Sequence, residues 1–177
     1  MGDVKVRAPL PKVLPARART SLERLDEAIT TTLARLAVPF LRLGLGVVFL
    51  WFGALKLVPG WSPAADLSTR TIEALTLGAV GPEVSLPGLA IWECLIGLGL
   101  LTGIAMRATL LLLLVQMAGT ITPLFLFPAE TFTVFPVAPT LEGQYIIKNI
   151  VLIGGAMVIG ATVRGGGVVP ERVDEAG

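Results

Sequence analysis

Several polar side chains lie inside long apolar runs of this sequence, where ionisable residues are rare. A charge at the centre of a bilayer costs about 2.5–3.5 kcal/mol on insertion scales, so such a side chain normally faces other helices and finds a partner. The charged candidates are Arg42, Lys56, Glu93 and Lys148, and the uncharged ones are Gln116, Thr120, Thr122 and Asn149. The chemistry open to this set is ion pairing, the binding of an anion or a carbonyl oxygen, and proton transfer through a carboxyl group.

The composition excludes most other kinds of reactive centre. The chain has no histidine, which excludes histidine-ligated haem, most zinc and copper sites, and every imidazole-based triad. Its one cysteine, Cys94, excludes an intramolecular disulfide, a CxxC redox pair and a cysteine-held iron–sulfur cluster. We therefore expect no metal site and no intrinsic cofactor, so that electron transfer would need a bound quinone or a partner subunit.

Four apolar runs are long enough to cross a membrane. Hydrophobic residues make up 54% of the 177 residues and charged residues only 15%, against about 25% charged residues in soluble domains. A membrane-spanning helix needs about 20 apolar residues, and runs of this order cover residues 39–58, 87–104, 108–127 and 145–163. The sequence therefore predicts an all-α integral membrane protein, with a four-transmembrane-helix bundle over residues 38–164.

The distribution of basic residues predicts the orientation of the bundle. With the N-terminus inside, eleven of the 14 lysines and arginines lie in cytoplasmic segments. The positive-inside rule then places both the N- and the C-terminus in the cytoplasm. On this topology Lys56, Glu93 and Lys148 converge in the outer half of the membrane from three different helices.

Glycine spacing predicts which helix faces carry these charges. Each charge shares a helical face with one or two glycines, and glycines allow the close backbone approach seen where membrane helices pack. The matched residues are Lys56 with Gly46 and Gly53, Glu93 with Gly97, and Lys148 with Gly155. We therefore expect all three charges to face the bundle.

Two interpretations of these residues remain open. In the first, Glu93 forms a salt bridge with Lys56 or Lys148 and only fixes the bundle. In the second, two lysines and one carboxylate leave a surplus positive charge, which suits an anion or a quinone oxygen, or Glu93 relays a proton. The ligand-binding candidates on the second interpretation are Lys56, Glu93, Lys148, Gln116, Thr120 and Asn149.

The segments outside the spans have their own patterns. The prolines and basic residues of residues 1–20 predict a disordered basic arm, and the glycines that begin residues 165–177 predict a flexible tail. Residues 21–37 carry leucine and isoleucine at helical spacing, which predicts an amphipathic helix at the inner membrane interface, with a dimerisation helix as the alternative. A short helix is predicted over residues 63–77. The phenylalanine-rich loop over residues 128–144 is predicted to form either an interfacial aromatic belt or a lid over an outer-leaflet site.

The apolar runs also carry a resemblance to a known family. The run Leu41–Pro59, with Trp51-Phe52-Gly53 and Lys56-Leu57-Val58-Pro59, resembles the first span of the YkgB/RclC-like inner-membrane proteins, a branch of the DoxX-like superfamily. Further matches are Glu93, Thr122-Pro123-Leu124, and Gly143 with Ile147-Lys148-Asn149. The resemblance covers residues 39–163 and implies a multi-pass protein of the bacterial cytoplasmic (inner) membrane. It also implies a link to oxidant stress, reactive chlorine included, and to quinone-linked oxidoreductase complexes.

Taken with the polar residues in the spans, the resemblance implies an accessory factor in oxidative stress resistance, with an outer-leaflet polar site that binds a quinone or a small anion. As an enzyme it is at most a quinone-linked oxidoreductase subunit without its own redox metal. The alternatives are a small-solute transporter or exporter and a structural scaffold subunit of a membrane complex. The expected partners are the lipid bilayer, a second copy of the chain or an oxidoreductase subunit, and not a nucleic acid.

Overall fold

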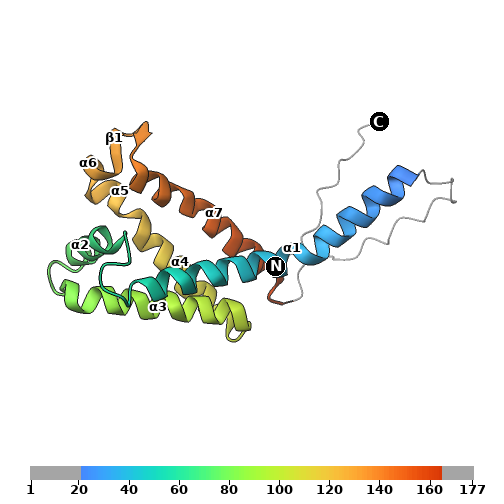
Figure 1. Cartoon of the computed structure of the whole chain (residues 1–177), viewed down its shortest axis with the longest axis horizontal. Helices are drawn as coiled ribbons and strands as arrows, with labels where there is room; N and C mark the ends of the chain where they lie inside the picture. Colours follow the sequence, from blue (N-terminus) through green and yellow to red (C-terminus); the bar gives the residue numbers. More distant parts are fainter. Residues whose placement is uncertain (1–20, 165–177) are drawn as a thin grey trace, which may run out of the picture. The chain divides into compact units, whose positions relative to one another are not determined.

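The computed structural model describes residues 21–164 (Figure 1). The predicted basic arm and flexible tail, residues 1–20 and 165–177, lie outside this range. The chain divides into two units with the boundary between Leu36 and Ala37. The elements are α1 (Ser21–Leu55), α2 (Ala65–Leu75), α3 (Pro82–Thr102), α4 (Met106–Ile121), α5 (Pro123–Leu126), α6 (Pro128–Thr131), β1 (Phe132–Val134), β2 (Ala138–Pro139) and α7 (Leu141–Thr162).

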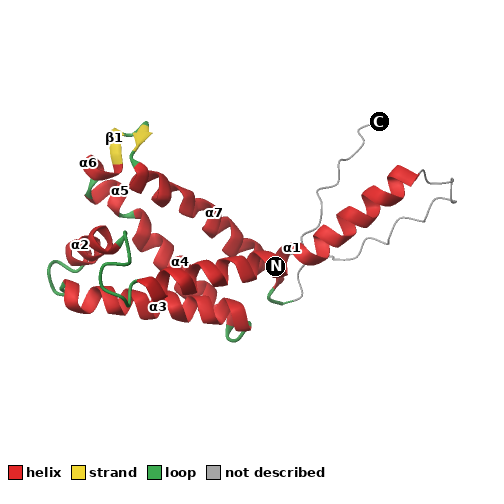
Figure 2. Ribbon diagram, viewed as in Figure 1, coloured by secondary structure: helices red, strands yellow, loops and turns green. Residues whose placement is uncertain are grey.

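Helices dominate the described residues (Figure 2), and four of these helical segments are long and apolar enough to cross a membrane. They are Arg24–Leu55, Pro82–Thr102, Met106–Leu126 and Leu141–Thr162. Each contains one of the four predicted spans or most of it, so the prediction of four membrane-spanning helices is confirmed. The predicted short helix over residues 63–77 is also present, as α2.

The helix that contains the first span begins earlier than the predicted span. Residues 21–37 and the span that follows were expected as separate helices, whereas the structure has one continuous helix, α1, with Pro39 inside it. Proline removes one backbone N–H donor but holds φ near the helical value, so a helix can continue through it. In the part of α1 before Ala37, the apolar side chains of Leu25, Ile29, Leu33 and Leu36 are exposed.

The second unit has a core built from all four spanning helices. Its buried apolar side chains are Leu45 and Phe49 of α1, Ile96 and Leu100 of α3, Leu110, Leu113 and Met117 of α4, and Ala156 and Ile159 of α7. Helix α4 packs on both α3 and α7, and α2 packs on α3. Large apolar side chains on the outer faces, such as Trp51, Leu111 and Ile150, are exposed, as expected for helices that face lipid. The four spans therefore form a bundle.

Helices α1 and α3 approach closely at glycines. A Cβ atom at Gly97 would lie 2.5 Å from the backbone nitrogen of Leu50, and a Cβ atom at Gly53 would lie 2.9 Å from the backbone nitrogen of Cys94. Only glycine leaves room for such contacts between helix backbones. This agrees with the glycine faces expected from the spacing for Lys56 and Glu93.

The third span is broken near its C-terminal end, between α4 and α5. Pro123 has no N–H to donate to the carbonyl of Gly119, four residues earlier. The Thr122 hydroxyl donates to that carbonyl instead, at 2.7 Å.

After α6, strands β1 and β2 form a short antiparallel pair that leads into α7. The loop predicted to be a belt or a lid is therefore an ordered helix–hairpin segment.

Candidate functional site

Three of the candidate residues meet in one buried cluster. Lys56 Nζ lies 2.6 Å from Glu93 Oε2, and Gln116 Nε2 donates to Glu93 Oε1 at 2.9 Å. Only 8% of Lys56, 8% of Glu93 and 7% of Gln116 is exposed. We call Lys56, Glu93 and Gln116 the polar cluster.

Three spanning segments position the polar cluster. Lys56 follows the last residue of α1, and its Nζ also donates to the carbonyl of Phe52 at 3.4 Å. Glu93 lies in α3 next to the glycine contact with α1, because the Cβ atom of Glu93 itself lies against Gly53. Gln116 comes from α4, which also packs on α3. The close approach of α1 and α3 therefore brings the lysine within ion-pair distance of the carboxylate.

Two further candidates form a separate contact between α4 and α7. Asn149 Nδ2 donates to Thr120 Oγ1 at 3.2 Å, and Thr120 Oγ1 donates to the carbonyl of Met117 at 3.0 Å. Both side chains are partly buried. No hydrogen bond in the described part of the chain joins this pair to the polar cluster.

Lys148 does not join the other two charges, so the expected convergence of three charges is wrong in this part. Its side chain is exposed, and its Nζ lies 5.3 Å from the centre of the Tyr145 ring on the same helix. Gly155, on the same face, does pack against Leu41 and Leu45 of α1. The spacing correctly places Lys148 and Gly155 on one face of α7. The prediction also assumed that this face meets the same neighbouring helices along its whole length. Near its start, however, α7 packs on α6 and β2.

The position of Lys148 changes the charge of the site. The predicted surplus of positive charge required two lysines beside one carboxylate. The polar cluster contains one lysine and one glutamate, and the amide of Gln116 is uncharged. Its charges therefore balance, which removes the main argument for a small anion at this place.

A second ion pair, which the sequence analysis did not identify, joins α2 to α6. Arg70 donates two hydrogen bonds to Glu130, at 2.7 and 2.6 Å, and also pairs with Asp66 at 2.8 Å. Its guanidinium lies 5.1 Å from the centre of the Phe127 ring. The Asp66–Arg70 spacing of four residues was visible in the sequence, but nothing there indicated Glu130, 60 residues further along. These contacts join the segment between the first and second spans to the segment between the third and fourth spans.

The Arg70–Glu130 pair shifts the ionisation of both groups. Hydrogen bonds from Arg70 hold the pKa of the Glu130 carboxyl below its usual value. Hydrogen bonds to Glu130, and then to Asp66, raise the pKa of the Arg70 guanidinium above its already high usual value. Both groups are therefore charged at neutral pH.

Comparisons with known proteins match this chain to one family. The DoxX family matches residues 37–129, from the start of the second unit to the middle of α6. The polar cluster and Thr120 lie inside the matched range, whereas Lys148 and Asn149 lie beyond it. No curated protein and no solved structure matches the chain. The match extends over more than half of the residues and agrees with the four apolar helices, and the chain accordingly belongs to the DoxX family.

Proposed function

We propose that this DoxX-family membrane protein binds the head group of a quinone at the polar cluster and acts as an accessory subunit in defence against oxidants. The observation that carries the proposal is the buried Lys56–Glu93 pair with Gln116 beside it. Charged groups buried inside a membrane bundle are costly, and they commonly mark a ligand or proton pathway.

The hydrogen-bonding groups of the polar cluster suit a quinone oxygen. The Lys56 ammonium has three N–H donors, and two of them are used by Glu93 and Phe52. Gln116 donates from its nitrogen, and its Oε1 receives no hydrogen bond from any residue that the structure describes. The cluster can therefore donate to a carbonyl oxygen through Lys56 and accept from a hydroxyl through Gln116.

A quinone is favoured over an anion because the charges of the cluster balance. An anion would add a net negative charge in a region of low dielectric constant, with Lys56 already paired to Glu93. A quinone adds no charge and has an apolar ring and tail that partition into the bilayer. When bound, it would supply the redox chemistry that this chain, without histidine and with one cysteine, does not supply from its own side chains.

The cellular role rests on the resemblance to the YkgB/RclC-like branch. On this proposal the protein lies in a bacterial inner membrane with both termini in the cytoplasm, and the polar cluster is in the outer half. Glu93 would hold or pass a proton when the quinone oxygen changes its protonation state. Electrons would come from a partner subunit or from the membrane quinone pool.

Quinone binding can be measured on the purified protein. Protein is isolated from quinone-containing membranes in a mild detergent, and the bound quinone is extracted and quantified per mole of protein. We expect wild type to retain quinone, and Gln116→Leu and the double variant Lys56→Met/Glu93→Leu to lose most of it. Lys148→Met is the matched control, because it removes an exposed lysine outside the polar cluster.

A survival test then connects the site to the cell. A deletion strain is complemented with each variant, membrane levels are matched, and survival after hypochlorite or peroxide is counted. We expect wild type and Lys148→Met to protect, and the two cluster variants to fail. If the cluster variants accumulate normally and protect like wild type, the polar cluster is only a structural clasp and the proposal is wrong.

A further inference from the structure

A cavity lies beside the middle of α1, away from the polar cluster. It has a volume of about 760 Å³ and is lined by α1, by the turn between α3 and α4, and by the end of α7. Arg42 and Lys56 are 14 residues apart, which corresponds to about 20 Å along a helix. The cavity is therefore separate from the polar cluster, and on the predicted topology it opens to the cytoplasmic side of the membrane.

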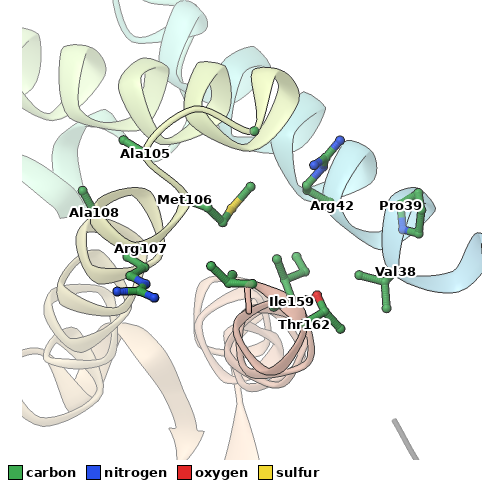
Figure 3. Close-up of a pocket in the computed structure, with 11 residues that line it drawn as sticks. Val38, Pro39, Arg42, Ala105, Met106, Arg107, Ala108, Ile159 and Thr162 are labelled. Carbon is green, nitrogen blue, oxygen red and sulfur yellow. Dashed lines mark hydrogen bonds between the residues drawn. The ribbon is translucent and has the colours of Figure 1, made fainter. Parts of the chain in front are cut away.

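Two arginines line this cavity, and no acidic residue is present among the described residues that do so. Figure 3 shows Arg42 on α1 and Arg107 on α4 at opposite sides, with Met106 between them. Neither guanidinium forms an ion pair with any described carboxylate. The cavity wall therefore carries two positive charges that no described group neutralises.

Arg42 also has an unsatisfied hydrogen-bond donor. Its Nε is fully enclosed and has no hydrogen-bond partner. A buried donor without a partner costs about 1–3 kcal/mol. The guanidinium lies against Gly103, where even a Cβ atom would come within 3.1 Å of Nη1. An oxygen ligand that accepted a hydrogen bond from Nε would remove this cost.

The backbone adds further donors at the same place. Ala105 precedes α4 in a left-handed conformation, φ 48°, and no side chain caps the helix. The first-turn N–H groups of Met106, Arg107 and Ala108 therefore have no acceptor within the helix. Both Met106 and Arg107 line the cavity. A helix start with free N–H groups favours a bound anion, and it reinforces the arginines.

We propose that this cavity binds a phosphate group, with the headgroup of an anionic phospholipid as its source. Planar guanidinium groups and helix N-termini both suit phosphate oxygens. The remaining wall is largely apolar and includes Val38, Met106 and Ile159. Such a wall suits the glycerol and acyl part of a lipid better than the hydration shell of a free phosphate. Basic pockets between membrane helices on the cytoplasmic side bind such headgroups.

The test compares a lipid with a soluble phosphate. Binding of phosphatidylglycerol and of phosphatidylcholine to the detergent-purified protein is followed by native mass spectrometry, and inorganic phosphate is titrated by calorimetry. We expect phosphatidylglycerol to bind more tightly than phosphatidylcholine. Arg107→Gln should weaken this binding about tenfold, the loss expected for one hydrogen bond to a charged group. Arg42→Lys, which keeps the charge and removes Nε, should also weaken it.

Two controls keep the result specific. Arg107 is exposed, so Arg107→Gln should leave the thermal midpoint unchanged. Lys148→Gln removes an exposed cation outside the cavity and should leave lipid binding unchanged. Arginine-dependent binding of inorganic phosphate, without a preference between the two lipids, would support the phosphate site and assign it to a soluble ligand. If neither arginine variant alters the binding of any of these ligands, the proposal is overturned.

Discussion

At the scale of single residues, the Lys56–Glu93 and Arg70–Glu130 ion pairs differ in what they contribute to stability. In the Lys56–Glu93 pair only 7% and 10% of the side chains is exposed, whereas in the Arg70–Glu130 pair the values are 38% and 45%. Exposed pairs are screened by water and salt, so they contribute little to stability. A buried pair is different, because the removal of one partner leaves the other charge without compensation. Substitution of one partner should therefore cost far more at the buried pair.

A double-mutant cycle tests this for the buried pair. Lys56→Met or Glu93→Leu alone should lower the free energy of unfolding by about 3–5 kcal/mol, because each leaves a buried charge unpaired. The double variant should recover all but about 1–2 kcal/mol, since only the Gln116 amide then lacks its acceptor. Unfolding in mixed detergent micelles gives all four values. Losses that simply add in the double variant would show that the two charges do not interact.

The exposed pair should make stability depend on pH. The folded pKa of Glu130 is lowered by Arg70, so its contribution is complete above the usual carboxyl pKa of 4.5. It is lost as the pH falls through the lower folded value. The thermal midpoint of wild type should therefore exceed that of Glu130→Gln at pH 7, and the difference should vanish in strong acid. Glu73→Gln, at an exposed glutamate of α2, is the control and should show no such difference.

At the scale of elements, helix contacts explain why the polar cluster forms. Gly53 and Gly97 bring the backbones of α1 and α3 together, and this places Lys56 beside Glu93. Trp92 Nε1 donates to the carbonyl of Leu112 at 3.2 Å, which adds a polar contact between α3 and α4. The cluster is therefore as sensitive to helix spacing as to its own side chains.

Alanine substitution of two helix glycines should separate packing from helix propensity. At Gly97 a new Cβ atom would collide with the Leu50 backbone, which cannot rotate away, so we expect a loss of about 1–3 kcal/mol. At Gly154 nothing lies within 4 Å, so alanine should be neutral or stabilise α7 by up to about 1 kcal/mol. Unfolding of both variants in detergent measures the difference. Equal effects at the two positions would contradict the close approach of α1 and α3.

At the scale of the whole molecule, the sequence predicts the features that depend on local composition. Hydropathy over about 20 residues is a local property, and it identified the four spans. The contact of Glu93 with Lys56, one of its two predicted partners, also followed, because topology and glycine spacing agreed. The exposure of Lys148 and the Arg70–Glu130 pair did not follow. Both depend on the path of residues 128–144, whose turns and short strands have no regular period.

The orientation of the bundle is the remaining large-scale prediction, and cysteine labelling can test it. In a Cys94→Ala background, single cysteines are placed at the exposed positions Glu73 and Ser21. The positive-inside rule places Glu73→Cys outside and Ser21→Cys inside. A membrane-impermeant maleimide should therefore label Glu73→Cys in spheroplasts and Ser21→Cys only after lysis. An exposed lipid-facing position, Ile150→Cys, should label poorly in both and serves as the control.

The reverse pattern would move both proposed sites to the opposite leaflet. The arginine-lined cavity would then open outside, away from the anionic cytoplasmic surface, and the argument for a lipid as the source of its phosphate would fail. The polar cluster would lie in the inner half of the membrane, so a proton on Glu93 would exchange with the cytoplasm. With the expected pattern, the Arg70–Glu130 contact and the polar cluster lie on the outer side and the arginines on the inner side. The two ends of one bundle would then have different ligands, a quinone at one end and a phosphate group at the other.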